Sequence, residues 1–132
     1  MGARLSSATT HHKALAVFAV VNFGNSAMMR VCDSMLPALA AEFAVTTGHA
    51  ALTVSCYAIT YGLMQLFFGP MGDRWGKRRV AGYAALACVP GNLLAAAATG
   101  LDVLVAARVL AAMAGAGISP LVFAWIGDTV PY

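Results

Sequence analysis

Charged residues are scarce in this chain of 132 residues: only 10% are Asp, Glu, Lys or Arg, whereas 61% are hydrophobic. A soluble domain usually carries about 25% charged residues. A soluble chain of this length would form one domain, but it could not hide so much apolar surface from water. The scarcity of charge therefore excludes an ordinary soluble domain and predicts a protein embedded in a membrane.

Cysteine and catalytic side chains are scarce as well. Cys32, Cys56 and Cys88 are far apart, and each lies in an apolar stretch. Their spacing fits neither a disulfide framework nor a zinc site, so we interpret them as small apolar core residues. The sequence has no Ser/His/Asp set, no metal-ligand spacing and no phosphate-binding loop. We therefore expect no enzymatic activity, no cofactor and no metal site.

Long apolar stretches dominate what the sequence does contain. A helix needs about 20 apolar residues to cross a bilayer, and several stretches approach or reach that length. We expect membrane-spanning helices at about 14–40, 50–72, 80–101 and 103–127. The predicted fold class is an all-α membrane protein whose four-helix transmembrane region covers residues 13–127. Residues 1–12 are small and polar and are expected to form a disordered cytoplasmic tail, and residues 128–132 the start of a cytoplasmic loop.

The net charge of +3 is unevenly spread along the chain. Lys13 precedes the first expected helix, and the loop at 73–79, between the second and third helices, holds four basic residues. The loops after the first and third helices contain no Lys or Arg. The positive-inside rule then predicts that the N-terminus and this loop are cytoplasmic. We expect an integral protein of the plasma (inner) membrane, surrounded by lipid. Membrane topology already explains the basic cluster, so we expect no nucleic-acid partner.

The basic loop has a specific pattern and lies between an uncharged run of 23 residues, Ala50 to Gly72, and one of 22 residues, Val80 to Leu101. The pattern G-x-x-x-D-R-x-G-x-R-R, which begins at Gly69, resembles the loop between the second and third helices of major facilitator superfamily transporters. Every fixed position is filled. The resemblance implies that the chain corresponds to the first four helices, about a third of a twelve-helix transporter. It also implies that the loop is a latch that stabilises the outward-facing state. The latch residues would be Gly69, Asp73, Arg74, Gly76, Arg78 and Arg79.

The residue types of this loop allow further expectations. Gly69 and Gly72 permit close helix contact, and Gly76 permits a left-handed turn. Asp73 could accept backbone N–H groups at a helix N-terminus, where negative charge is favoured. Because the fourth helix returns to this face, we expect Asp128 to approach Arg74 or Arg78. The alternative is that the basic cluster sets only the orientation of the chain in the membrane.

Charges inside the expected spans are costly and usually mark function. Arg30 and Asp33 are three residues apart, hence neighbours on a helix, and Arg108 is expected at about the same depth. Asn22 and Ser26 extend the first two into a polar stripe that must face a cavity or other helices. The alternative is that Arg30 and Asp33 only reach outward to lipid headgroups.

The family resemblance assigns roles to these charges. The pattern Asp33-x-x-x-Pro37-x-Leu39 resembles the first helix of drug and metabolite exporters, and Arg108 resembles the fourth-helix arginine of proton-coupled antiporters. The second match is partial, because Ala111 and Ala112 stand where the family often has Gln and Gly. Proton coupling would then involve Arg30, Asp33 and Arg108.

Polar and small side chains fill other parts of the spans. Tyr57, Tyr61 and Gln65 could line the cavity with Asn22 and Ser26, or could pack between helices. In the fourth span, Gly115 and Gly117 predict close helix packing. Pro90 and Pro120 are expected to bend their helices. The candidates for the cavity lining are Asn22, Ser26, Tyr57, Tyr61 and Gln65.

The sequence thus predicts transmembrane transport of a small organic solute, by efflux in exchange for protons, with this chain as the N-terminal part of the transporter. Its partners would be the solute, protons, membrane lipid and the missing C-terminal helices or an oligomeric partner. One alternative is a self-sufficient four-helix exporter that works as an oligomer. Another is a membrane-embedded partner subunit that transports nothing.

Overall fold

The computed structural model describes the backbone of residues 2–129 and the side chains of residues 13–128. Within this part of the chain all regular structure is helical, which confirms the predicted all-α fold. The helices are α1 (Gly2–Glu42), α2 (Thr47–Ala50), α3 (Leu52–Trp75), α4 (Lys77–Ala96), α5 (Leu101–Gly115) and α6 (Ile118–Thr129).

Among the residues that the structure describes, three helical stretches are long and apolar enough to cross a membrane: Lys13–Glu42, Thr47–Trp75 and Leu101–Asp128. The second stretch consists of α2 and α3 together, and the third consists of α5 and α6 together. Helix α4 is not among them, although its 20 residues would extend over about 30 Å at 1.5 Å per residue. Its first turn contains three basic residues, and its second half contains Pro90 and Asn92. These polar and helix-disfavouring residues make α4 less apolar.

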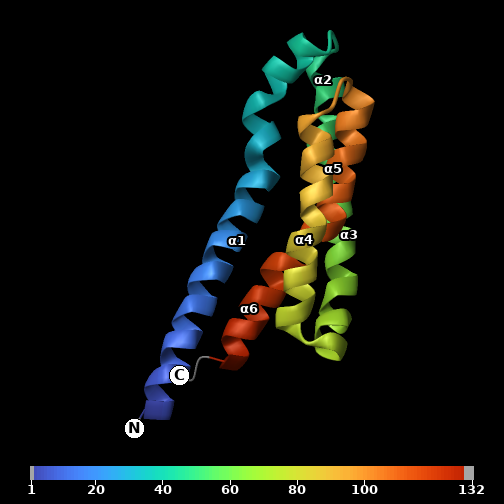
Figure 1. Ribbon diagram of the computed structural model, residues 1–132. Coiled ribbons are helices and arrows are strands. Elements are labelled where there is room, and N and C mark those ends of the chain that lie inside the picture. Colours follow the sequence, from blue (N-terminus) through green and yellow to red (C-terminus); the bar gives the residue numbers. More distant parts are fainter. Residues whose placement is uncertain (1, 130–132) are drawn as a thin grey trace.

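Helices α1 and α3 run in opposite directions, α4 runs opposite to α3, and α5 and α6 both run back toward the end where the turn between α3 and α4 lies (Figure 1). Helices α3, α4 and α5 lie side by side, α1 is inclined to them, and α6 lies between α1 and α4. The turn between α3 and α4 and the end of α6 lie at the same end of the bundle. The buried cluster is formed mainly by α3, α4, α5 and α6. Much of α1 is exposed, including Val20 and Phe23, at 72% and 76%.

Residues 2–12 differ from expectation. They continue helix α1, which begins at Gly2, whereas the sequence led us to expect a disordered tail. The segment contains no proline, and residues added to an existing helix do not repeat the cost of nucleation. The apolar part of α1 therefore lets the helix extend through this polar segment.

Gly76 makes the tight turn between α3 and α4. Its φ of 90° and ψ of 120° are rarely adopted by residues that carry a Cβ atom. The expectation of a positive-φ turn at this glycine is confirmed. Because a single residue separates the two helices, the basic residues on both sides of the turn are held close together.

The last expected span is broken into α5 and α6 at Ala116 and Gly117. Pro120 causes the break, because its ring is incompatible with the carbonyl four residues earlier, whereas proline is tolerated in the first turn of a helix. A Cβ atom on Gly117 would lie 2.5 Å from the Phe68 ring of α3. The prediction of close packing at this glycine is confirmed, and the same holds for Gly115, where a Cβ atom would lie 2.8 Å from Asn25 Oδ1.

Candidate functional site

Arg108 is a buried cation at the contact between α5 and α1, with only 3% of its surface exposed. Its Nη1 donates a hydrogen bond to the carbonyl oxygen of Met28 at 2.6 Å, and its Nη2 donates to that of Met29 at 3.4 Å. The guanidinium also lies 4.1 Å from the centre of the Tyr57 ring. Backbone dipoles and the face of an aromatic ring both attract a cation, so they offset part of the cost of burying this charge.

No carboxylate pairs with Arg108 among the described residues. Its Nε, moreover, is buried without a hydrogen-bond partner. A buried charge is normally paired, because removing it from water is costly. Arg108 therefore keeps an unused donor inside the bundle, and no described carboxylate neutralises its charge.

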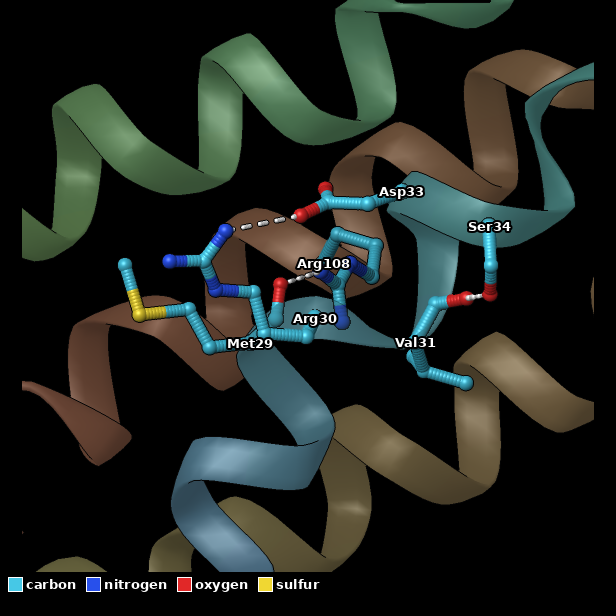
Figure 2. A network of polar contacts seen from close by, with 6 residues as sticks. All are labelled: Met29, Arg30, Val31, Asp33, Ser34 and Arg108. Carbon is cyan, nitrogen blue, oxygen red and sulfur yellow. Dashed lines mark hydrogen bonds and ion pairs between the residues drawn. The ribbon is translucent and has the colours of Figure 1, made fainter.

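Arg30 and Asp33 form an ion pair beside this cation, with 3.4 Å between Arg30 Nη1 and Asp33 Oδ2. Figure 2 shows the pair together with Arg108. Arg108 binds the carbonyls one and two residues before Arg30, which fits the expected common depth. Asp33 itself is engaged by Arg30, whose side chain is 81% exposed, and not by Arg108.

The expected polar stripe on α1 does not face inward as a unit. Ser26 and Arg30 are exposed, and the Ser26 hydroxyl donates to the carbonyl of Asn22 at 2.9 Å. Only Asn22 of this stripe bonds to another helix, because its Oδ1 accepts from Ser119 at 2.6 Å. A step of four residues turns about 40° past a full helical turn, so Ser26 and Arg30 rotate progressively away from the packed face.

Asn25 is the inward-facing polar residue that the sequence interpretation missed. It is 6% exposed, and its Nδ2 donates to Tyr61 Oη at 3.3 Å and to Ser119 Oγ at 3.2 Å. These contacts join α1, α3 and α6. The available signal was its position three residues after Asn22, on nearly the same helical face. Asn25 Oδ1 has no hydrogen-bond partner in the described part of the chain.

Tyr57 and Tyr61 are stacked, with ring centres 5.9 Å apart, and are buried between helices. Both rings therefore pack between helices, which is one of the two roles that the sequence left open for them. Gln65, one turn further along α3, is exposed. The structure therefore brings Asn22 and Tyr61 into one polar network through Asn25 and Ser119, and it leaves Ser26 and Gln65 at the surface.

Lys77 connects the basic turn to α6. Its Nζ lies 2.5 Å from Asp128 Oδ2 and 4.0 Å from Asp73 Oδ1. The hydrogen bond to Asp128 raises the pKa of Lys77 above its ordinary value. We expected Asp128 to approach Arg74 or Arg78. Asp128 does reach the turn, but it pairs with Lys77, which occupies a variable position of the loop pattern.

Two other expectations for this turn are wrong. Asp73 lies in the last turn of α3 and not at a helix N-terminus, and α4 begins at Lys77, preceded by Gly76 as an N-cap that has no side chain to accept a hydrogen bond. Gly69 is exposed and a Cβ atom there would meet nothing within 4 Å. Gly72, in contrast, is buried against Leu121 of α6, so its close-contact role is confirmed.

The comparison with known families identifies the bundle. The model of the Major Facilitator Superfamily matches residues 18–132. The chain belongs to the major facilitator superfamily. As a member of this superfamily it is an integral membrane protein of a transporter family, which agrees with the expectation drawn from the basic loop.

Individual relatives of this superfamily protein support the assignment. Multidrug resistance protein D of Escherichia coli is 34% identical over 80 residues, which are 61% of this chain and 20% of that protein. The uncharacterized MFS-type transporter YybF of Bacillus subtilis is 24% identical over 113 residues, 86% of this chain and 28% of that protein. An uncharacterized transporter of Buchnera aphidicola is 23% identical over 108 residues, 82% of this chain and 26% of that protein.

This superfamily chain thus spans 20–28% of the length of these relatives. No solved structure matches it.

Proposed function

We propose that the chain supplies the first four helices of a transporter that exports a small organic solute in exchange for protons. The observation that carries the proposal is the buried guanidinium of Arg108, which has no carboxylate partner among the side chains of residues 13–128 and lies at the depth of the Arg30–Asp33 pair. Charges at membrane depth are expensive and are kept where an ion or proton must be handled. The name of the Escherichia coli relative, multidrug resistance protein D, favours a drug-like organic solute.

Asp33 is the proposed proton acceptor. When its carboxylate takes up a proton, its attraction to Arg30 is lost and the net positive charge near Arg108 rises by one. Repulsion between like charges increases where water is excluded. Because Arg108 is bound to α1 only through the carbonyls of Met28 and Met29, this repulsion favours movement of α1 relative to α5.

The turn between α3 and α4 is the proposed conformational latch. Asp73, Arg74, Gly76, Arg78 and Arg79 fill the family pattern, and Lys77 adds the contact to Asp128 of α6. Exposed ion pairs of this kind are individually weak, so they can be broken and re-formed as helices move. We propose that this end of the bundle is cytoplasmic, because the basic residues gather at it. We propose that the membrane is the inner membrane.

The proposed solute path follows the exposed polar side of the bundle. Ser26 and Gln65 are accessible in this structure, whereas Tyr57, Tyr61 and Asn22 are engaged in helix packing. The path would be completed by further helices, because alternating access needs two bundles that rock about a site between them.

The test combines gene sequencing with transport measurements. The coding sequence is read beyond Tyr132, and the complete product is reconstituted in proteoliposomes with an imposed proton gradient and a panel of amphipathic cations. We expect gradient-driven flux that is lost in Asp33→Asn and retained in the control Asp102→Asn, which changes an exposed carboxylate at the start of α5. Unchanged gradient-driven flux in Asp33→Asn would exclude Asp33 as the proton acceptor.

The chain of 132 residues is tested alone in the same assay. We expect it to insert into the membrane without transporting, because four helices supply only part of one bundle. Saturable uptake by the pure chain, lost in Asp33→Asn, would instead establish the oligomeric exporter. Absence of flux from the complete coding product, together with specific crosslinking to another membrane protein, would establish the partner subunit.

A further inference from the structure

Two adjoining hollows form one groove along α3 and α4. The first, of about 390 Å³, is lined by Arg74, Trp75, Arg79, Val80 and Tyr83. The second, of about 230 Å³, shares Trp75, Val80 and Tyr83 with the first. It continues between the two helices over apolar side chains, which include Phe68, Met71, Ala84 and Ala114. The groove is therefore basic at the end near the turn and apolar along the rest of its length.

The basic end carries charge that the protein does not neutralise. Arg74 and Arg79 are exposed, and no carboxylate lies within 4.0 Å of either among the residues that the structure describes. The nearby acids, Asp73 and Asp128, both face Lys77. Two guanidinium groups are thus left at the mouth of the groove, and guanidinium is the side chain that best matches a phosphate group.

Two aromatic rings line the groove where its basic and apolar parts meet. The residues are Trp75 and Tyr83, which are 64% and 73% exposed. Tryptophan and tyrosine concentrate at the level of the lipid headgroups, because their rings have both polar and apolar parts. Their position places the boundary between headgroups and hydrocarbon at the junction of the two hollows.

We propose that this α3–α4 groove binds one anionic phospholipid, with its phosphate at Arg74 and Arg79 and an acyl chain over the apolar part. A basic pocket between helices is suited to an anionic headgroup, and the adjoining apolar hollow is suited to the attached chain. A free phosphate would use only the basic end. The groove is separate from the proposed coupling site, because the side chains that line it come from α3, α4 and α5 and none of the described ones from α1.

Quenching of Trp75 fluorescence by brominated lipids tests the proposal. The chain has 2 tryptophans, so Trp125→Phe leaves Trp75 as the only tryptophan, which can be excited selectively. This variant is placed in phosphatidylcholine vesicles that contain either brominated phosphatidylglycerol or brominated phosphatidylcholine. We expect an apparent affinity for phosphatidylglycerol that is roughly fivefold higher or more, the factor that a single basic residue contributes near an anionic surface.

Matched variants identify the groups responsible. In the Trp125→Phe background, the double change Arg74→Gln and Arg79→Gln should abolish the preference for phosphatidylglycerol. Lys13→Gln, which removes a charge on α1 near the same end of the bundle, should leave it intact. The double change Arg74→Lys and Arg79→Lys should retain a preference for phosphatidylglycerol, which separates loss of charge from loss of folding. Circular dichroism checks the helix content of each variant.

Equal quenching by the two lipids would overturn the proposal, as would a preference that survives the change of both arginines to glutamine. Inorganic phosphate serves as a competitor that distinguishes the two sources of the anion. We expect millimolar phosphate to leave the quenching unchanged, because it cannot replace the contacts of the acyl chain. Displacement of the lipid by phosphate alone would show an anion site without a lipid site.

Discussion

At the scale of single residues, the guanidinium of Arg108 is held by backbone carbonyls of α1 and by the face of Tyr57. Carbonyl oxygens in a helix have a second lone pair and can accept an additional donor. Such contacts do not depend on the side chains of Met28 and Met29. They allow α1 to shift along Arg108 without a specific partner being lost, which suits the movement of α1 that the proposed function requires.

We predict that Arg108→Ala loosens the contact between α1 and α5. Hydrogen bonds to a charged group contribute about 1.5–3 kcal/mol, so α1 should separate more often and expose the buried thiol of Cys32. In a background that carries Cys56→Ala and Cys88→Ala, the rate of maleimide labelling at Cys32 should rise about tenfold, the equivalent of about 1.4 kcal/mol. Arg30→Ala, which removes an exposed guanidinium, should leave the rate unchanged. An unchanged rate in Arg108→Ala would show that α1 is held by other contacts.

A second residue-scale prediction compares two glycines of α4. A Cβ atom on Gly91 would lie 2.8 Å from the backbone nitrogen of Ala111, whereas one on Gly82 would meet nothing within 4 Å. Gly91→Ala should therefore destabilise the fold by about 1–3 kcal/mol, the usual cost of overpacking. Gly82→Ala should be neutral or should stabilise it by up to about 1 kcal/mol. Unfolding in mixed detergent and sodium dodecyl sulfate, followed by circular dichroism, measures both. Equal stabilities would contradict the close approach of α4 and α5.

At the scale of elements, the one-residue turn at Gly76 determines how α3 and α4 meet α6. The helices cannot separate at this end, because a single glycine joins them. Lys77 at the start of α4 then reaches Asp128 near the end of α6. The contact joins a turn to a helix that lies 51 positions away in the chain, so it reports directly on the packing of α6.

The pH dependence of this contact follows from the raised pKa of Lys77. A lysine whose pKa is raised by folding contributes its full stabilisation below its ordinary value of 10.5. The contribution is lost as the pH rises through the higher value of the folded state. We predict that the distance between spin labels at Arg78→Cys and Gly127→Cys, in a background without other cysteines, stays constant from neutral pH up to the ordinary lysine value of 10.5 and increases as the pH rises further.

Asp128→Asn is the control for this measurement. It removes the acceptor that raises the pKa of Lys77, so the distance should become longer and insensitive to pH over the same range. Asp73→Asn should have a smaller effect, because Asp73 lies 4.0 Å from Lys77. A pH profile that is identical with and without Asp128 would show that the ion pair does not hold α6.

At the scale of the whole molecule, the bundle leaves much of α1 uncovered. Helix α1 carries exposed apolar residues and the exposed Arg30–Asp33 pair on surfaces that no described residue covers. Apolar residues can face lipid without cost, but a pair of charges cannot. The proposed function assigns this side to the solute path, against helices of the opposing bundle.

We predict that Gly2 and the turn at Gly76 lie on the cytoplasmic side and that the loop between α1 and α2 lies outside. Lys and Arg gather at the first of these ends, whereas residues 43–51 and 97–102 at the other end contain neither. In a background without other cysteines, Thr46→Cys in intact cells should react with an impermeant thiol reagent, and Ser6→Cys should react only after permeabilisation. The opposite labelling pattern would reverse the orientation and remove the proposed cytoplasmic latch.

The sequence alone determined the class of the protein. The scarcity of charge and the length of the apolar runs require a membrane, and the pattern around Asp73 and Gly76 indicated the superfamily that the family comparison confirmed. Gly76, Gly115 and Gly117 could be assigned because their roles depend on local backbone geometry or on the absence of a side chain. These properties belong to composition and to short segments, which tertiary packing does not alter.

Only the tertiary structure decided which polar groups meet. Helical spacing gives the angle between side chains around one axis, but it does not give the direction from which neighbouring helices approach. The way α1 approaches the other helices turned Asn25 inward and left Ser26 exposed. The break before Pro120 directed α6 so that Asp128 meets Lys77 rather than Arg74 or Arg78. Contacts between residues far apart in the chain depend on these inclinations and breaks, which arise from the packing of the whole bundle.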